Sequence, residues 1–180
     1  MRLFGRERGA TLIEASLIMP IMILIMISTL ELGLAFKDYL TISYASREGS
    51  RVGALAGNEP TADCEIVHSI IDILGAANLN DFQRIEIFAA DPATGNQILA
   101  KTNTWALVGS DPYDCANDWT IVENWPAATR NVVFGPSSTL DIIGVRIIQT
   151  HNYITGMPPF RGSFDVDEVT ITRMEPEAFE

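Results

Sequence analysis

Cysteine, histidine and basic side chains are all scarce in this sequence of 180 residues. Two cysteines and two histidines exclude a Cys₄ cluster and form no zinc-finger pattern. Lys and Arg number 12 against 23 Asp and Glu, which gives a net charge of −11. Because no net positive field is available to displace counterions from phosphate, we expect no nucleic-acid partner.

Motifs for catalysis are also missing. The sequence has no Gly-x-Ser-x-Gly, no glycine-rich phosphate-binding loop and no His-Glu-x-x-His. His151 follows a predicted strand and has no nucleophile motif near it. We therefore expect neither an enzyme nor a bound cofactor. Hydrophobic residues make up 47% of the chain, which is too many for a disordered protein.

Charge and apolar residues are distributed unevenly along the chain. Residues 1–58 carry six basic and five acidic side chains, so all of the net negative charge falls on the remainder. Most of the apolar excess lies in the same first third. This division indicates an anchor followed by an acidic domain.

The first third contains one long apolar run, from Leu12 to Phe36, with no charged residue between positions 15 and 30. About 20 helical residues cross the hydrocarbon layer of a membrane, so the run is long enough to span it. Three arginines precede the run, at positions 2, 6 and 8. This asymmetry predicts a cytoplasmic N-terminus and an extracytoplasmic C-terminal part in a single-pass protein of the cytoplasmic membrane.

Two other interpretations of this run compete with a membrane helix. A buried core helix is disfavoured because the run is long and apolar on every face. A cleaved secretory signal could end at the small residues Gly33-Leu34-Ala35, but the run exceeds the usual length of about 7–15 residues. A retained membrane helix is the favoured interpretation.

Glu14 is a carboxylate inside this apolar run and needs a physical reason. Either it reaches the lipid headgroups, or it has a partner. If the chain is cut after Gly9, Ala10 acquires an α-amine with a pKa of about 7.7–8.0, which is largely protonated at neutral pH. In an assembly of parallel helices, the amine of one subunit could neutralise Glu14 of the next.

The segment Arg8-Gly-Ala-Thr-Leu-Ile-Glu14, followed by an apolar helix, resembles a type IV prepilin leader. Together with Ala45-Ser-Arg-Glu-Gly-Ser-Arg51 it is similar to the TadE-like family, the pseudopilins of the tight-adherence (Flp) pilus machinery. The resemblance covers residues 8–56. Ala10 departs from the large residue common in prepilins and suits the TadE-like pattern.

The resemblance implies cleavage between Gly9 and Ala10 by a prepilin peptidase, and a role for Glu14 in assembly. It also implies other pilins or pseudopilins, inner-membrane pilus assembly proteins and membrane lipid as partners, with incorporation into a surface pilus as one outcome. Residues 1–9 would then be the leader, 10–56 the helix and 57–180 an extracytoplasmic head. An alternative function is a binding module on a plain single-pass anchor, with no pilus role, which recognises a ligand through a tryptophan-rich loop.

The predicted helix continues beyond the apolar run to residue 56, where Gly57-Asn-Glu-Pro60 is a strong stop signal. Its second half carries a stripe of apolar residues, Leu40, Tyr44, Val52 and Leu55, with small Ala45 and Gly49 between them. We expect this half of the helix to cradle the head. Such a helix would be about 70 Å long, and Pro20 should kink it.

The pattern of residues 57–180 predicts an α+β head with a small antiparallel sheet. An amphipathic helix is expected over 62–75 and strands over 84–89, 97–101, 140–149 and 164–173. Val169 and Ile171 are expected on the buried face of the last strand. Residues 103–138 are expected to be rich in loops and contain all three tryptophans.

Cys64 and Cys115 both follow the membrane segment, and on the outer side of a membrane a disulfide is the default. The alternative is two free buried thiols. The segment from Asp111 to Asp118 concentrates oxygen ligands but lacks an EF-hand pattern, so an acidic solvated loop is favoured over a calcium site, and no metal ligand is assigned.

Overall fold

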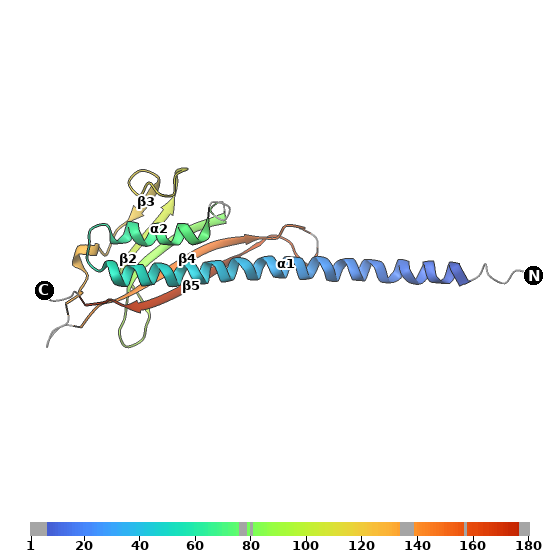
Figure 1. Ribbon diagram of the computed structural model, residues 1–180, viewed down its shortest axis with the longest axis horizontal. Helices are drawn as coiled ribbons and strands as arrows, with labels where there is room; N and C mark the ends of the chain where they lie inside the picture. Colours follow the sequence, from blue (N-terminus) through green and yellow to red (C-terminus); the bar gives the residue numbers. More distant parts are fainter. Residues whose placement is uncertain (1–6, 76–78, 80, 134–138, 157, 177–180) are drawn as a thin grey trace, which may run out of the picture.

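A computed structural model describes residues 7–75, 79, 81–133, 139–156 and 158–176. One long helix, α1 (Glu7–Ala56), dominates its shape, and its C-terminal part carries the rest of the protein (Figure 1). The helix is continuous through Pro20. It ends where the sequence predicts, because Gly57 adopts a φ of 60° that other residues avoid.

The head contains a second helix, α2 (Ala62–Leu74), and a five-stranded antiparallel sheet. The strands are β1 (Phe82–Ala90), β2 (Gln97–Leu107), β3 (Trp119–Val122), β4 (Ile142–Asn152) and β5 (Ser163–Arg173). Their order across the sheet is β3-β2-β1-β4-β5, and a 3₁₀ turn, η2 (Ala127–Thr129), lies between β3 and β4. The predicted α+β class with a long N-terminal helix is confirmed.

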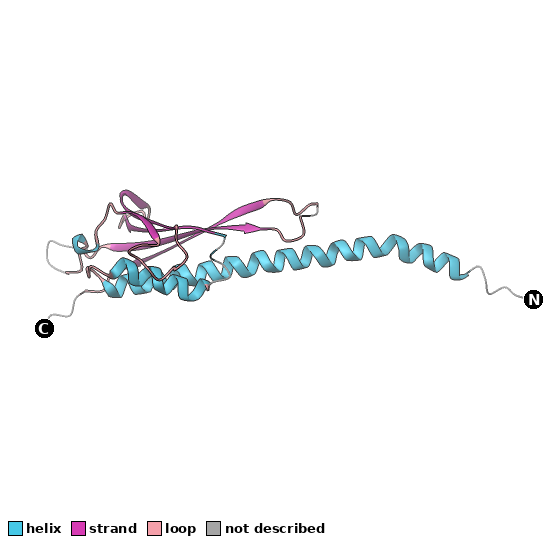
Figure 2. Cartoon of the chain, turned by 90° about the horizontal axis from the view of Figure 1, so that it is seen from above, coloured by secondary structure: helices cyan, strands magenta, loops and turns pink. Residues whose placement is uncertain are grey.

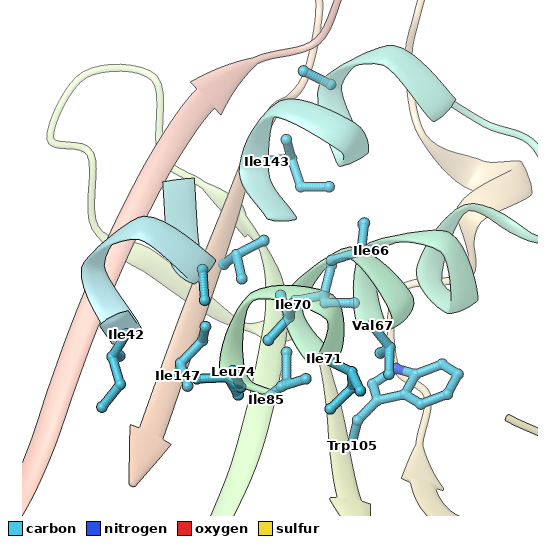
Figure 3. Packing of buried hydrophobic residues seen from close by; sticks show 14 of the residues in the cluster. Ile42, Ile66, Val67, Ile70, Ile71, Leu74, Ile85, Trp105, Ile143 and Ile147 are labelled. Carbon is cyan, nitrogen blue, oxygen red and sulfur yellow. The ribbon is translucent and has the colours of Figure 1, made fainter. Parts of the chain in front are cut away.

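Both helices lie on one face of the sheet, as Figure 2 shows from above. Between them and the sheet lies a core of aliphatic side chains from α2, β1 and β4 (Figure 3). The α2 residues predicted to share one face, Val67, Ile70, Ile71 and Leu74, are all buried there. Ile143 and Ile147 of β4 face them from the sheet.

Small residues of α1 allow the helix to approach this core closely. A Cβ at Gly53 would lie 2.7 Å from Cδ1 of Ile143 and 2.8 Å from Cδ1 of Ile66. A Cβ at Gly49 would meet Ile70 at 2.8 Å. The predicted stripe is therefore only partly right: its small members, Ala45 and Gly49, are buried, and Val52 packs against the core. The large members of the predicted stripe, Leu40, Tyr44 and Leu55, are exposed.

The buried face of β5 was also wrongly predicted. Val169 and Ile171 are 47% and 42% exposed, whereas Val166 is buried. The positions that turn toward α1 are Glu168, Thr170 and Thr172. The interface between the last strand and the long helix is thus polar.

Candidate functional site

The N-terminal half of α1 extends beyond the head (Figures 1 and 2). Its sequence is apolar on all sides of the helix. Large side chains there are mostly more than half exposed, for example Leu17 at 67%, Ile21 at 61% and Met26 at 66%. By length and composition this helix is able to cross a membrane, and it is a candidate membrane anchor. So much exposed apolar surface requires lipid or other helices to cover it.

The residues assigned to processing and assembly lie at the start of this bare half. Gly9 and Ala10 are in the first turn of α1, while positions 1–6 of the predicted leader lie outside the described residues. Glu14 follows one turn later and is exposed. No residue within the described part of the chain pairs with its carboxylate. In a single chain, the Glu14 carboxylate is therefore available to pair with a group of another molecule.

Glu31 ends the uncharged stretch of α1 and is fully buried. Its Oε1 accepts a hydrogen bond from the backbone N–H of Thr155 at 2.6 Å, and its Oε2 accepts one from Ile154 at 3.2 Å. Both donors lie in the connection between β4 and β5. The carboxylate therefore holds this hairpin against α1. A signal for it is present in the sequence, since Glu31 interrupts the apolar run as Glu14 does, but sequence reasoning missed it.

A ladder of polar contacts continues from Glu31 along α1. Two turns later, Asp38 Oδ2 lies 2.7 Å from Nδ1 of His151, which is 4% exposed and packs against the rings of Tyr153 and Phe164. His151 is therefore a structural residue at the end of β4.

Three serines extend the ladder along β5. Ser43 pairs with Glu168 at 3.2 Å, Ser46 with Thr170 at 2.6 Å and Ser50 with Thr172 at 2.6 Å. A step of three or four helical residues rises about 5–6 Å, close to the length of about 6.8 Å that two strand residues cover. The near match lets successive polar residues on the two elements meet in order, which fixes the register of α1 on the head.

Cys64 and Cys115 form a disulfide, as the sequence predicts. It joins α2 to the loop before β3 and closes a separation of 51 residues. His68 lies beside it, with Nε2 3.4 Å from each sulfur and 2.9 Å from the carbonyl oxygen of Tyr113. These three side chains are close enough to share a metal ion, but sulfurs bonded to each other are not thiolate ligands.

The acidic segment 111–118 uses its carboxylates within its own turns. Asp111 accepts from the N–H of Tyr113, and Asp114 accepts from those of Ala116 and Asn117. Asp118 accepts from the N–H of Asp111 at 2.5 Å. Hydrogen bonds from Asn117, its side chain above all, hold the pKa of the Asp114 carboxyl below its ordinary value. All three carboxylates therefore accept hydrogen bonds from the segment's own backbone.

The three tryptophans are buried and do not form a recognition surface. Trp105, Trp119 and Trp125 are 5%, 5% and 2% exposed. Trp105 and Trp119 pack edge to face, with ring centroids 6.0 Å apart. Trp125 lies under the guanidinium of Arg130, at 4.6 Å from Cζ to the ring centroid. The tryptophan-rich loop therefore belongs to the core of the head.

Residues 9–51 match the family model described as TadE-like protein. The matched segment begins at the expected processing site and includes Glu14, Glu31 and the helix face that meets the head. It agrees with the resemblance to the TadE-like family found in the sequence, a family associated with the Tad pilus. The chain matches no curated protein and no solved structure.

Proposed function

We propose that this chain is a membrane-anchored pseudopilin that takes part in assembling a tight-adherence (Flp, type IV-like) pilus or a related secretion machinery. The observation that carries the proposal is the bare apolar half of α1, with an unpaired Glu14, inside the segment that matches the TadE-like family. The three arginines before the apolar run favour a cytoplasmic N-terminus. The Cys64–Cys115 disulfide suits a head on the oxidising side of the membrane.

The proposed mechanism begins with removal of residues 1–9 by a prepilin peptidase at the cytoplasmic face. The cut gives Ala10 a charged amine next to the bare helix. A lone carboxylate at the centre of a membrane costs about 2.5–3.5 kcal/mol on insertion scales, and less toward the ends. Pairing the Ala10 amine of one subunit with Glu14 of another removes both unpaired charges. Ala10 and Glu14 are four residues apart, so paired helices would be offset by about 6 Å along their axes.

Residues 57–180 would form the extracytoplasmic head that meets sister subunits, and residues 10–56 would connect it to the membrane. The ladder from Glu31 to Ser50 would keep the head at a fixed position on α1. A rigid connection of this kind suits a subunit whose helix must enter a bundle in register. The partners would be other pilins or pseudopilins and inner-membrane assembly proteins.

The alternative function is a binding module on a plain anchor that recognises a ligand through exposed tryptophans. The tryptophans are buried, which removes the support for this binding surface. An exchange of residues 11–30 for an unrelated membrane helix separates the two functions. The pseudopilin loses activity in pilus assembly after this exchange, whereas a binding module on a plain anchor keeps its activity.

The test of the proposal is Glu14→Ala in the full chain, compared with Glu48→Ala as a control on the same helix. Glu48 is paired with Arg51 on the part of α1 that the head covers. Both variants should fractionate with membranes. Only Glu14→Ala should reduce pilus assembly and co-purification with sister subunits. Normal assembly by Glu14→Ala would remove the charge-pairing mechanism.

A further inference from the structure

The hairpin of β4 and β5 reaches farther along α1 than the rest of the head, and its tip points toward the N-terminal end of the helix (Figures 1 and 2). Residues 153–162 connect the two strands. Pro158 and Phe160 of this connection face Met19, Ile23 and Ile27 of α1 across a groove of about 490 Å³. The walls of the groove are almost wholly apolar.

The position of this tip along α1 sets its depth relative to the uncharged stretch. Glu31 is the first charged residue after position 14, and Ile27 lies about 6 Å before it along the helix axis. Met19 lies about 18 Å before it. The hairpin tip therefore extends past the charged boundary and lies beside the part of α1 that the proposed function places in the hydrocarbon.

The composition of the tip suits such a location. Ile154 is 71% exposed, and Phe160 follows two consecutive prolines. Backbone N–H groups without a hydrogen-bond partner are costly in lipid. Pro158 and Pro159 have no backbone N–H group, so they do not add to this cost. The N–H groups of Ile154 and Thr155 are satisfied by Glu31.

The charge that follows the tip fits the same arrangement. Arg161 is exposed and has a long side chain that can extend to the headgroups. The tip thus carries apolar side chains and two prolines and is bordered by a cation.

We propose that the tip of the β4–β5 hairpin inserts into the outer leaflet of the bilayer beside α1, with lipid acyl chains filling the groove. This inference rests on the proposed anchoring of α1 and adds a second membrane contact. The groove is continuous with the bare surface of α1, so the same lipid that covers the helix covers the tip. Two contacts at different distances from the helix axis fix the tilt of the head on the membrane.

The experiment measures the depth of single nitroxide labels on the full chain in vesicles of phosphatidylethanolamine and phosphatidylglycerol. No free cysteine is present in the described chain, so one introduced thiol takes the label. Phe160→Cys reports on the tip, Met26→Cys on the bare helix and Leu99→Cys on an exposed strand of the head. Collisions with oxygen report lipid, and collisions with a water-soluble nickel chelate report solvent.

The proposal predicts that the label at position 160 resembles that at 26, with an oxygen-to-nickel collision ratio several-fold above that at 99. A label at 154 should lie shallower than the one at 160. If the Phe160 variant fails to fold, Pro159→Cys reports on the same turn.

Two results overturn the hairpin proposal while anchoring of α1 stands. One is a label at 160 in water with the label at 26 in lipid. The other is a label at 160 shielded from both reagents, which means that another protein segment fills the groove. A label at 26 in water overturns the proposed membrane anchoring itself, and the hairpin proposal with it.

Discussion

The backbone N–H of Thr155 donates a 2.6 Å hydrogen bond to Oε1 of Glu31, although 124 residues separate the two in sequence. This contact joins the end of the uncharged stretch of α1 to the tip of the β4–β5 hairpin. It ties the helix that we assign to the membrane to the domain that we assign to the outside.

Replacement of Glu31 by Ala should release the hairpin from α1. Hydrogen bonds to a charged acceptor contribute about 1.5–3 kcal/mol each, and this carboxylate accepts two from backbone donors. Hydrogen exchange should therefore accelerate at the amides of Ile154 and Thr155 and stay unchanged in α2. Glu48→Ala, at a half-buried position of the same helix where the carboxylate pairs with Arg51, should leave both regions as they are. Equal protection of these two amides in both variants would contradict the assigned role.

Gly53→Val should destabilise the head, because its Cβ would lie within 3 Å of side-chain atoms of Ile143 and Ile66. Overpacking of this kind costs about 1–3 kcal/mol. The measurement is urea-induced unfolding of the head in detergent micelles. Gly33→Ala is the matched control, since nothing lies within 4 Å of its added Cβ and alanine favours helix. A Gly53→Val variant as stable as the parent would mean that α1 does not approach the core as described.

Asp63→Ala should lower the free energy of unfolding by about 3–5 kcal/mol, the usual cost of breaking a buried ion pair. Asp63 pairs with Arg130, whose side chain is fully buried, and accepts a 2.7 Å hydrogen bond from Nδ2 of Asn103. Asn103 in turn binds the backbone of Trp125. Glu65→Ala on the exposed side of α2 should change the stability by less than about 0.5 kcal/mol. Equal effects of the two substitutions in thermal unfolding would contradict this network.

Acid should weaken the head through carboxylates whose pKa is lowered on folding. The N–H and hydroxyl of Thr94, with the N–H of Ala93, hold the pKa of the Asp91 carboxyl below its ordinary 3.8. Asn117 lowers the pKa of Asp114 in the same way. Such groups stabilise the fold above their unfolded pKa, and this contribution is lost as the pH falls through the folded value.

The melting temperature should therefore decline as the pH drops below about 4. The double variant Asp91→Asn, Asp114→Asn should show a shallower decline over that interval. A parent and variant with parallel pH profiles would show that these turns do not contribute.

The sequence located most elements of the head but misjudged the buried face of β5 and, in part, that of α1. Hydrophobic periodicity predicts the buried face of an element correctly where the interface is apolar. Ile70 and Ile71 of α2, which are both buried, are an example. It fails along α1 and β5, where Ser46 meets Thr170 and Ser50 meets Thr172, because a polar interface leaves no hydrophobic stripe to detect.

Strand β3 was also missed. It has four residues, of which only Trp119 is buried, and it lies at the edge of the sheet against β2. A short edge strand with one buried residue has too little alternation for recognition. Glu31 shows a different limit, since a carboxylate in an apolar run signals a partner but does not identify it.

The first residue of the membrane-extracted protein distinguishes a processed pseudopilin from an intact membrane anchor. Removal of the leader would create the charged amine that we assign as the partner of Glu14. N-terminal sequencing or intact mass should therefore find a chain that begins at Ala10 and carries the Cys64–Cys115 disulfide. A mature protein that still begins at Met1, with its three arginines in place, would rule out pairing between the Ala10 amine and Glu14.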